Sequence, residues 1–298
     1  MTPRATGLAF AILPVTIFSI QDGITKYLGD NYPAIFIAMM RYWAFAGFAV
    51  LMASRSRAGL AGTASTSRPL LQITRGVLLA VQIVVAILSF SWVGLAQSQA
   101  VFQSAPLLVA LLSMPLLGER VGWRRWTAIA IGFVGVILVL MPDTGGFDLY
   151  TLLPMACAVI YSLYSITTRL ASRTDAAATS FFYTGVAGAA AISLVGPFYW
   201  SSFTGNDGYL MIALCIIGVA GHYCLIRAFD SVDAVIVQSM SYLQLVLVTI
   251  IGVVVYGESL GFNMVVGSAI VVAAGLFTIY REAVAGKKPL KMDPSGEL

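Results

Sequence analysis

Residues 95–119 read LAQSQAVFQSAPLLVALLSMPLLGE, and residues 234–258 read AVIVQSMSYLQLVLVTIIGVVVYGE. Neither stretch contains an Asp, Glu, Lys or Arg before its final glutamate. Crossing a hydrocarbon core of about 30 Å takes roughly 20 residues of helix, and both stretches are long enough. Neither alternates apolar and polar residues as a barrel strand would. Because lipid cannot satisfy free backbone N–H and C=O groups, we predict that both are membrane-spanning helices.

The composition extends this prediction to the whole chain. Of its 298 residues, 59% are apolar and 10% are charged, and the mean hydropathy is +0.90. A soluble domain carries about a quarter charged residues because its surface must be hydrated, so the apolar surplus must face lipid. We expect an all-α, polytopic membrane protein with ten transmembrane helices, at residues 6–28, 33–53, 71–93, 96–117, 124–141, 149–170, 176–198, 209–229, 232–256 and 262–280.

The basic residues lie almost entirely on one side of this arrangement. With a cytoplasmic N-terminus, every Lys and Arg except Lys26 and Arg41 falls in or at the edge of a cytoplasmic segment, Arg75 included. Cytoplasmic loops retain Lys and Arg, so we expect a multi-pass protein of the cell inner (plasma) membrane with both termini in the cytoplasm. The net charge of +4 is then an orientation signal, and we expect no nucleic acid as a partner.

The two quoted stretches also align with each other. Gly118-Glu119 matches Gly257-Glu258, and Gln99 matches Gln238 at the same offset. The period is about 140 residues, or five helices, and an odd number of helices inverts the second copy in the membrane. Inverted repeats are typical of transporters, because two pseudo-symmetric halves can open a central site to either side.

The repeat divides the chain into three parts. We expect a first five-helix repeat over residues 1–145, an inverted second one over 146–282, and a cytoplasmic tail over 283–298. In each repeat the glycine of the Gly-Glu pair suits the left-handed cap after a helix. The glutamate suits the positive N-terminal end of the helix that follows.

Several of these features together resemble the EamA-type branch of the drug/metabolite transporter superfamily. They are an aromatic-Ser pair followed by Lys26 in the first helix, Arg41 within the second, and the endings Gly118-Glu119-Arg120 and Gly257-Glu258. The resemblance spans residues 6–280. It departs from the family in the first helix, where Ile17-Phe18-Ser19-Ile20 replaces the usual Trp-Gly, so no role is assigned to those positions.

The resemblance implies a 5+5 inverted-repeat α-bundle. Its first, third, fourth, sixth, eighth and ninth helices would surround a central cavity, and its fifth and tenth would lie outside. Members of the family export amino acids and related metabolites, while relatives carry nucleotide sugars, phosphorylated sugars or cationic drugs. An expected activity is therefore transport by alternating access.

Polar side chains concentrate on the helices that would line this cavity. A charge or strong dipole at membrane depth needs a partner or water, and a cavity supplies both. Each such residue could instead make an ordinary helix–helix hydrogen bond. The predicted substrate-binding residues are Gln21, Gln82, Trp92, Gln99, Gln103, Tyr161, Tyr164, His222, Gln238 and Tyr242.

Asp22, Lys26 and Arg41 form the predicted coupling or gating group. Asp22 and Lys26 are four residues apart on one helix, close enough to form an ion pair, and Arg41 should reach the same region. If Asp22 is paired in this way, transport should follow the solute gradient. If Asp22 carries a proton instead, a pH gradient should drive accumulation.

The cavity chemistry also narrows the cargo. Phosphorylated substrates would require several converging Lys or Arg side chains, and a lipophilic cation would require an unpaired acidic one. Amides, phenols and a histidine favour a neutral or zwitterionic solute. We therefore expect a monomeric or weakly dimeric exporter of small metabolites, most of all amino acids, including aromatic and other apolar ones.

Other functions stay open at this point. A drug/cation or nucleotide-sugar-type transporter of the same superfamily is the main alternative, and a non-transporting membrane scaffold or an intramembrane enzyme is a remote one. The chain has no Gly-x-Ser-x-Gly or His-Glu-x-x-His motif and a single histidine, so we expect no catalytic residues. Its three cysteines lack metal-ligand spacing, and we expect neither a metal nor a cofactor.

Overall fold

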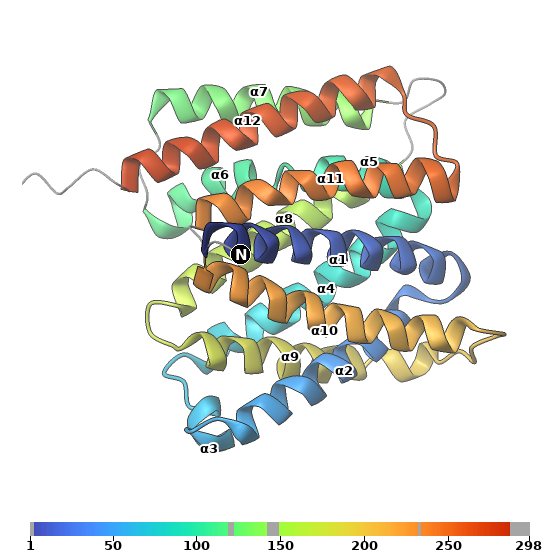
Figure 1. Cartoon of the computed structure of the whole chain (residues 1–298), viewed down its shortest axis with the longest axis vertical. Helices are drawn as coiled ribbons and strands as arrows, with labels where there is room; N and C mark the ends of the chain where they lie inside the picture. Colours follow the sequence, from blue (N-terminus) through green and yellow to red (C-terminus); the bar gives the residue numbers. More distant parts are fainter. Residues whose placement is uncertain (1–2, 119–121, 142–148, 232–233, 287–298) are drawn as a thin grey trace, which may run out of the picture.

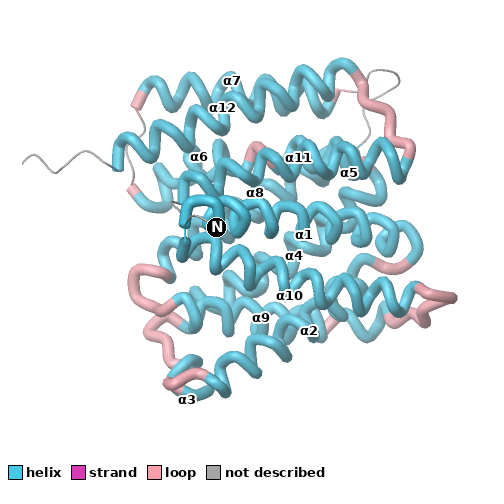
Figure 2. The backbone as a smooth tube through the Cα atoms, in the orientation of Figure 1, coloured by secondary structure: helices cyan, strands magenta, loops and turns pink. Residues whose placement is uncertain are grey.

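A computed structural model describes residues 3–118, 122–141, 149–231 and 234–286. Within these residues the regular elements are all helices (Figures 1 and 2), which confirms the predicted all-α class for this part of the chain. The longer helices are α1 (Pro3–Asn31), α2 (Ala34–Arg55), α4 (Pro69–Trp92), α7 (Trp123–Leu140), α8 (Leu153–Ala171), α9 (Ala177–Ser193), α10 (Asp207–Ser231), α11 (Ala234–Tyr256) and α12 (Phe262–Gly286). The shorter ones are α3 (Gly59–Ala64), α5 (Leu95–Phe102), α6 (Ala105–Leu117) and the 3-10 turns η1 (Leu149–Leu152) and η2 (Gly196–Tyr199).

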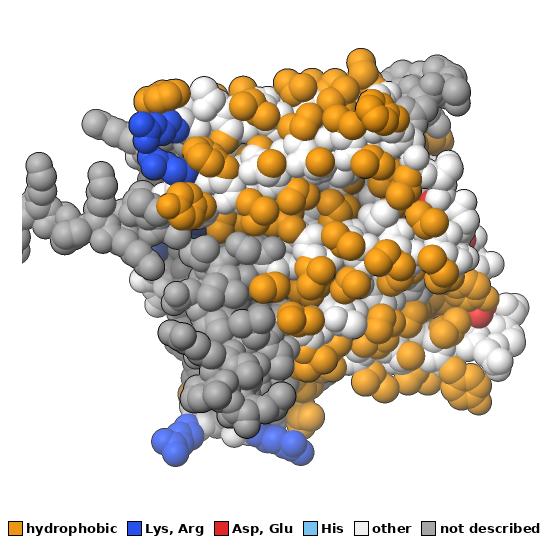
Figure 3. Space-filling view, turned by 45° about the horizontal axis from the view of Figure 1, so that its top comes forward, with side chains coloured by type: hydrophobic (Ala, Val, Ile, Leu, Met, Phe, Trp, Pro, Cys, Tyr) orange, Lys and Arg blue, Asp and Glu red, His pale blue; other side chains and the backbone are white. Residues whose placement is uncertain are grey.

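Within the described ranges, five helical stretches are long and apolar enough to cross a membrane. They are Ala34–Arg55, Pro69–Trp92, Leu95–Leu117, Leu149–Ala171 and Phe262–Arg281, and three shorter apolar helices cover Trp126–Leu140, Asp207–His222 and Met240–Tyr256. Apolar side chains spread over the face of the bundle shown in Figure 3, with basic groups at one end and acidic groups at the other. The chain is a multi-pass membrane protein, and the number of ten crossings stays a prediction.

The helices form a layered bundle with α7 and α12 at one edge (Figure 1). Glycines let these two helices touch, since a Cβ on Gly135 would lie 2.8 Å from the carbonyl oxygen of Gly267. In the body of the bundle α1 packs against α10 and α11, and α4 packs against α8 and α9. This peripheral place of α7 and α12 agrees with the outer position that the family resemblance implies for the fifth and tenth spans.

The predicted fourth span is interrupted in its middle. α5 ends at Phe102 and α6 begins at Ala105, because Pro106 has no N–H to donate to the carbonyl four residues earlier. The backbone N–H of Ser104 donates to the oxygen of Val101 at 2.9 Å, in a tighter turn. The predicted span over 96–117 corresponds to the apolar stretch Leu95–Leu117, and the break within it was not predicted.

The glycines of both Gly-Glu pairs cap helices as predicted. Gly118 has φ of 70° and Gly257 has φ of 65°, in the left-handed region that favours glycine. Glu258, however, caps α5 rather than the helix that follows it. Its Oε1 and Oε2 accept from the backbone N–H groups of Leu95 at 2.6 Å and Ala96 at 2.9 Å. Glu119 and Arg120 lie outside the described residues.

Lys26 joins the same end of the bundle. Its Nζ donates to the carbonyl oxygen of Phe90 at 2.9 Å and lies 3.5 Å from Oδ2 of Asp30 and 3.9 Å from Oε1 of Glu258. These contacts tie the ends of α1 and α4 to the start of α5. The predicted ion pair between Asp22 and Lys26 is therefore wrong, because the ammonium is drawn to two acidic groups and a helix C-terminus instead.

Candidate functional site

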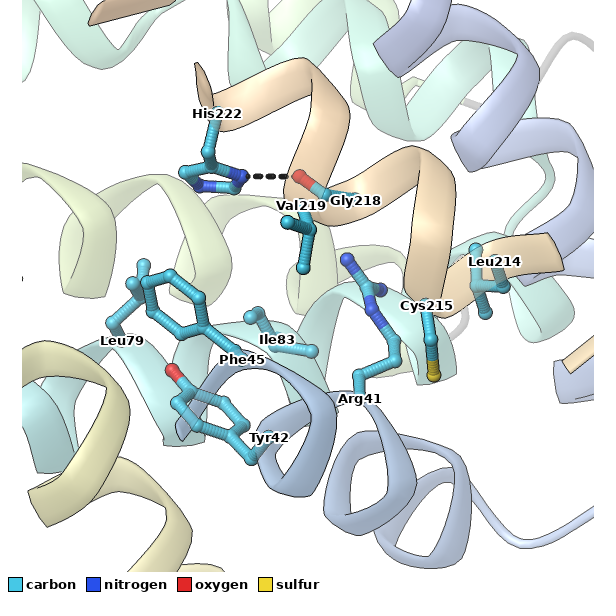
Figure 4. Close-up of a pocket in the computed structure, with 10 residues that line it drawn as sticks. All are labelled: Arg41, Tyr42, Phe45, Leu79, Ile83, Leu214, Cys215, Gly218, Val219 and His222. Carbon is cyan, nitrogen blue, oxygen red and sulfur yellow. Dashed lines mark hydrogen bonds between the residues drawn. The ribbon is translucent and has the colours of Figure 1, made fainter. Parts of the chain in front are cut away.

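A pocket lies between α2, α4 and α10 (Figure 4). The unfilled space amounts to about 430 Å³, including the part that opens to the surroundings. Its polar side chains are Arg41, Tyr42 and His222, and its apolar wall is formed largely by Phe45, Leu79, Ile83 and Leu214. The predicted cavity helices include α4 and α10 but not α2, so the pocket differs from the expectation in drawing three of its residues from α2.

An apolar groove adjoins this pocket. It is lined by Ala44, Phe48, Cys215, Ile216, Val219 and Ala220, and it shares Cys215 and Val219 with the pocket. All six residues lie on α2 or α10. The pocket therefore continues along the seam between these helices into a space suited to an apolar group.

His222 is held by α10 itself. Its Nδ1 lies 2.9 Å from the carbonyl oxygen of Gly218 (Figure 4), and since a carbonyl only accepts, Nδ1 carries the proton. In the neutral ring Nε2 is then a hydrogen-bond acceptor. The ring also packs edge-on against Phe18 of α1, with centroids 5.3 Å apart, and 5.5 Å from Phe45. His222 thus has a fixed ring plane, and its Nε2 accepts no hydrogen bond from the described part of the chain.

Asp22 and Arg41 each have one hydrogen bond to a neutral partner. Oδ2 of Asp22 accepts from Nε2 of Gln244 on α11 at 2.8 Å. Among the residues that the structure describes, Arg41 donates to Thr25 alone, with 3.5 Å between Nη1 and Oγ1. Among the described residues both ion pairs of the bundle belong to Lys26. The expected pairing of Asp22 with Arg41 is therefore not formed within 4 Å.

Several predicted substrate-binding residues make helix–helix contacts. Gln82 on α4 donates to the thiol sulfur of Cys157 on α8 at 3.1 Å, and Gln103 donates to the carbonyl oxygen of Ser241 on α11 at 2.6 Å. The ring of Tyr164 lies 5.4 Å from the guanidinium carbon of Arg75. These contacts are the structural alternative that the sequence leaves open.

The other predicted residues are not among those that line the pocket, although Gln21 lies beside it, with its Oε1 3.1 Å from where a Cβ on the pocket residue Gly218 would be. Trp92 is 56% exposed and packs on Tyr150, and Tyr161 is 43% exposed. Tyr242 is buried with its hydroxyl against α12, where a Cβ on Gly275 would lie 1.7 Å from it. Gln21 and Gln99 are buried in α1 and α5, and the side chain of Gln238 lies outside the described residues. Substrate contact by these residues stays a prediction.

Arg75 is a buried arginine that the sequence places at the cytoplasmic edge. It is 2% exposed and lies between α4, α8 and α9. Its Nε donates to Thr168 at 2.9 Å, its Nη2 to Thr184 at 3.2 Å, and its Nη1 to Gln72 and to the carbonyl oxygen of Ser180. The position, only six residues after the helix start at Pro69, carried no signal of this burial.

Tyr42 and Phe45 are the aromatic pocket residues that sequence reasoning missed. They lie one and four residues after Arg41, so helical spacing places Phe45 on the same face as the arginine. That spacing was the available signal. The pocket as a whole offers a guanidinium, an imidazole acceptor and aromatic rings, which can bind a small solute with both an ionised and an apolar part.

Known proteins share this chain's sequence over most of its length. A family model described as the EamA-like transporter family matches residues 5–141 and 149–280. An S-adenosylmethionine uptake transporter of Rickettsia felis is 27% identical over 280 residues, covering 94% of each chain. A riboflavin transporter of Rhizobium johnstonii is 27% identical over 292 residues, covering 95% of this chain and 94% of the relative. A pseudopaline exporter of Pseudomonas aeruginosa is 25% identical over 247 residues, covering 81% and 84%.

Proposed function

The chain belongs to the EamA-like transporter family, and from this premise we propose that it exports amino acids and amino-acid-derived metabolites, aromatic and other apolar ones included, across the bacterial inner membrane. It is a membrane transporter. The proposal concerns its cargo, its direction and its orientation.

The proposed substrate class rests on the mixed chemistry of the pocket. Arg41 offers a cation, His222 a neutral acceptor, and Phe45 an aromatic face, while Asp22 on neighbouring α1 offers a carboxylate that no cation approaches within 4 Å among the described residues. Opposite charges that are not paired with each other suit a zwitterion, which carries one charge of each sign. The apolar seam between α2 and α10 suits its side chain.

The names of similar proteins support a small metabolite as the transported solute. S-adenosylmethionine is itself an amino acid that bears a purine ring, and riboflavin is a neutral aromatic solute. The relatives are named for uptake and for export, so we assign export to this chain as the direction to test. We also propose that both termini are cytoplasmic, which the gathering of basic groups at one end of the bundle supports (Figure 3).

Counterflow in proteoliposomes tests the cargo. Vesicles with the purified chain would be loaded with one unlabelled solute and offered the same solute with a radiolabel, across a panel of amino acids, S-adenosylmethionine, riboflavin, nucleosides and drug cations. We expect exchange of apolar amino acids above that of protein-free vesicles. A scaffold or an enzyme would exchange none of the panel, and exchange of drug cations or nucleosides alone would contradict the proposed cargo.

Net direction needs a separate measurement. A strain that overproduces the chain and is fed a dipeptide should release the liberated amino acid faster than a strain without it, because export lowers the internal pool. Slower release with faster uptake from the medium would reverse the assigned direction and leave the cargo unchanged.

A further inference from the structure

Arg41 has far more hydrogen-bonding capacity than it uses. A guanidinium carries five N–H donors and no acceptor. Among the described residues its one hydrogen bond is the 3.5 Å contact with Thr25, at the long limit for such a bond. The nearest acidic side chain in its surroundings, Asp22, is engaged by Gln244 instead. Most of the donors of Arg41 are therefore left for another partner.

The unused donors of Arg41 are informative because this residue lies within a membrane-spanning helix. A charge at membrane depth costs from about 2.5 to more than 10 kcal/mol unless it is paired or hydrated. Arg75 shows that this bundle can supply a buried guanidinium with four neutral oxygens from three helices. Arg41 has no such set, and its side chain extends from α2 toward α10 into the pocket (Figure 4). The open donors therefore face the space that a solute would occupy.

A second polar group of the pocket is also without a partner. The hydroxyl of Tyr42 has no hydrogen-bond partner among the described residues, although the side chain is 2% exposed. Tyr42 and Arg41 are adjacent on α2 and both line the pocket. A buried hydroxyl and a half-buried guanidinium with most of its donors unused among the described residues would each be satisfied by a ligand that supplies acceptor oxygens.

We infer that Arg41 binds the carboxylate of the transported solute. A carboxylate supplies two acceptor oxygens that match the guanidinium fork, and its negative charge compensates the positive one. The rest of the solute would then lie against Phe45 and Ile83 toward the apolar seam. The inference rests on the proposed function and sharpens it, since it makes Arg41 the residue that selects solutes with a free carboxylate over otherwise equal solutes without one.

Competition in the counterflow assay tests this selection. The labelled probe is L-phenylalanine, and the unlabelled competitors are L-phenylalanine, its methyl ester and phenethylamine, which keep the ring and amine but lose the anionic group. For the wild type we expect the acid to compete about ten- to a hundredfold better than the ester or the amine, the range for one charged hydrogen-bonded contact. In Arg41→Gln we expect the three competitors to converge, with Arg41→Lys in between because it keeps the charge and loses the fork.

The controls separate this role from a structural one. Arg124→Gln removes an exposed arginine at the start of α7 that stacks over Trp123, and it should keep the wild-type preference. Equal elution of all variants in gel filtration shows that they are folded. A preference for the acid that persists in Arg41→Gln, or that is absent from an actively exchanging wild type, overturns the inference alone. A wild type that exchanges riboflavin or nucleosides but no amino acid overturns the proposed function, and the inference with it.

Discussion

Two arginines of this bundle, the buried Arg75 and the half-buried Arg41, differ in what surrounds them. Arg75 donates to oxygens of Gln72, Thr168, Ser180 and Thr184, so four of its five N–H donors are used. Arg41 has one long contact with a threonine and opens onto a pocket. The same side chain is therefore a brace between helices in one place and a binding group in the other, and the number of satisfied donors separates the two roles.

The internal repeat relates the places of these two arginines in the bundle. The two matched copies, 5–141 and 149–280, make α2 and α9 equivalent, and likewise α4 and α10. Arg41 projects from α2 toward α10, while Arg75 projects from α4 toward α9. Both guanidinium groups thus lie between equivalent helix pairs, supplied from opposite members. Both arginines belong to the first copy, and we infer that the pair α4–α9 is braced by Arg75 while the pair α2–α10 keeps most donors of Arg41 available.

The largest effect expected from this comparison is on stability. Arg75→Gln leaves the hydroxyls of Thr168 and Thr184 and the amide of Gln72 without their shared donor in a buried place. Breaking such a network costs about 3–5 kcal/mol, which should lower the thermal unfolding midpoint in detergent by about 5–15 °C. Arg41→Gln should change the midpoint by no more than about 2 °C, because it removes one weak contact.

Scanning fluorimetry on both variants at one heating rate measures this difference, since unfolding of a membrane protein in detergent is commonly irreversible. Equal midpoints for the two variants would break the comparison. A lower midpoint for Arg41→Gln than for Arg75→Gln would reverse it and assign the brace to Arg41.

Glu258 is an acidic residue whose carboxylate, like the guanidinium of Arg75, has several hydrogen-bonding partners. Its carboxylate accepts two backbone N–H groups of α5 and faces Lys26, so Glu258→Gln should destabilise the bundle by about 1–3 kcal/mol. Asp30→Asn is the matched control, because Asp30 pairs with the same lysine from a more exposed place, and it should cost less than about 1 kcal/mol. A larger midpoint shift in the Asp30 variant would show that the helix cap contributes little.

Local rules predicted the parts of this structure that depend on neighbours in sequence. The uncharged stretches predicted helices, and the caps at Gly118 and Gly257 follow from glycine at the end of an apolar run. The partners of Glu258 lie more than 160 residues away in sequence. No spacing rule within one helix could select them over the start of the next helix.

The sequence predicted some residues of the candidate site but not which of them come together. Arg41 and His222 stand out in the sequence as polar residues in apolar spans, and the structure brings both to one pocket. Their proximity requires α2 to lie beside α10, which periodicity does not encode. The burial of Arg75 likewise depends on the hydroxyls of Thr168 and Thr184 from two other helices. Isolated polar residues were therefore identified, and their partners were not.

Substitution of Asp22, like that of Arg41, should affect transport more than stability, because the carboxylate has few partners among the described residues. Asp22→Asn keeps an oxygen that can accept from Gln244, so the unfolding midpoint should shift by no more than about 2 °C. The amine of an amino-acid solute should lose a charged partner, which raises KM in counterflow by about tenfold. Accumulation driven by a pH gradient in the wild type, lost in Asp22→Asn while exchange persists, would identify Asp22 as a proton carrier instead.

The smallest effect on stability should come from Asp175, which lies in the loop between α8 and α9 and contacts Gln72, a partner of Arg75. Its carboxylate accepts from Nε2 of Gln72 at 2.6 Å and from the hydroxyl of Thr66, and Gln72 in turn holds Arg75. These hydrogen bonds, that of Gln72 first, hold the pKa of Asp175 below its ordinary value. A carboxyl whose folded pKa is depressed stabilises the fold above the unfolded pKa, near 4, and that contribution is lost as the pH falls through the folded value.

The difference in unfolding midpoint between the wild type and Asp175→Asn should therefore be present at pH 7 and shrink as the pH is lowered from about 5 toward 3. It should be small, because the carboxyl lies close to solvent, which screens its charge. Thr66→Val provides the matched control, since it removes one of the two donors and should keep part of the pH dependence. A difference that stays constant down to pH 3, or that grows on acidification, would show that the loop holds Gln72 through its shape and not through this charge.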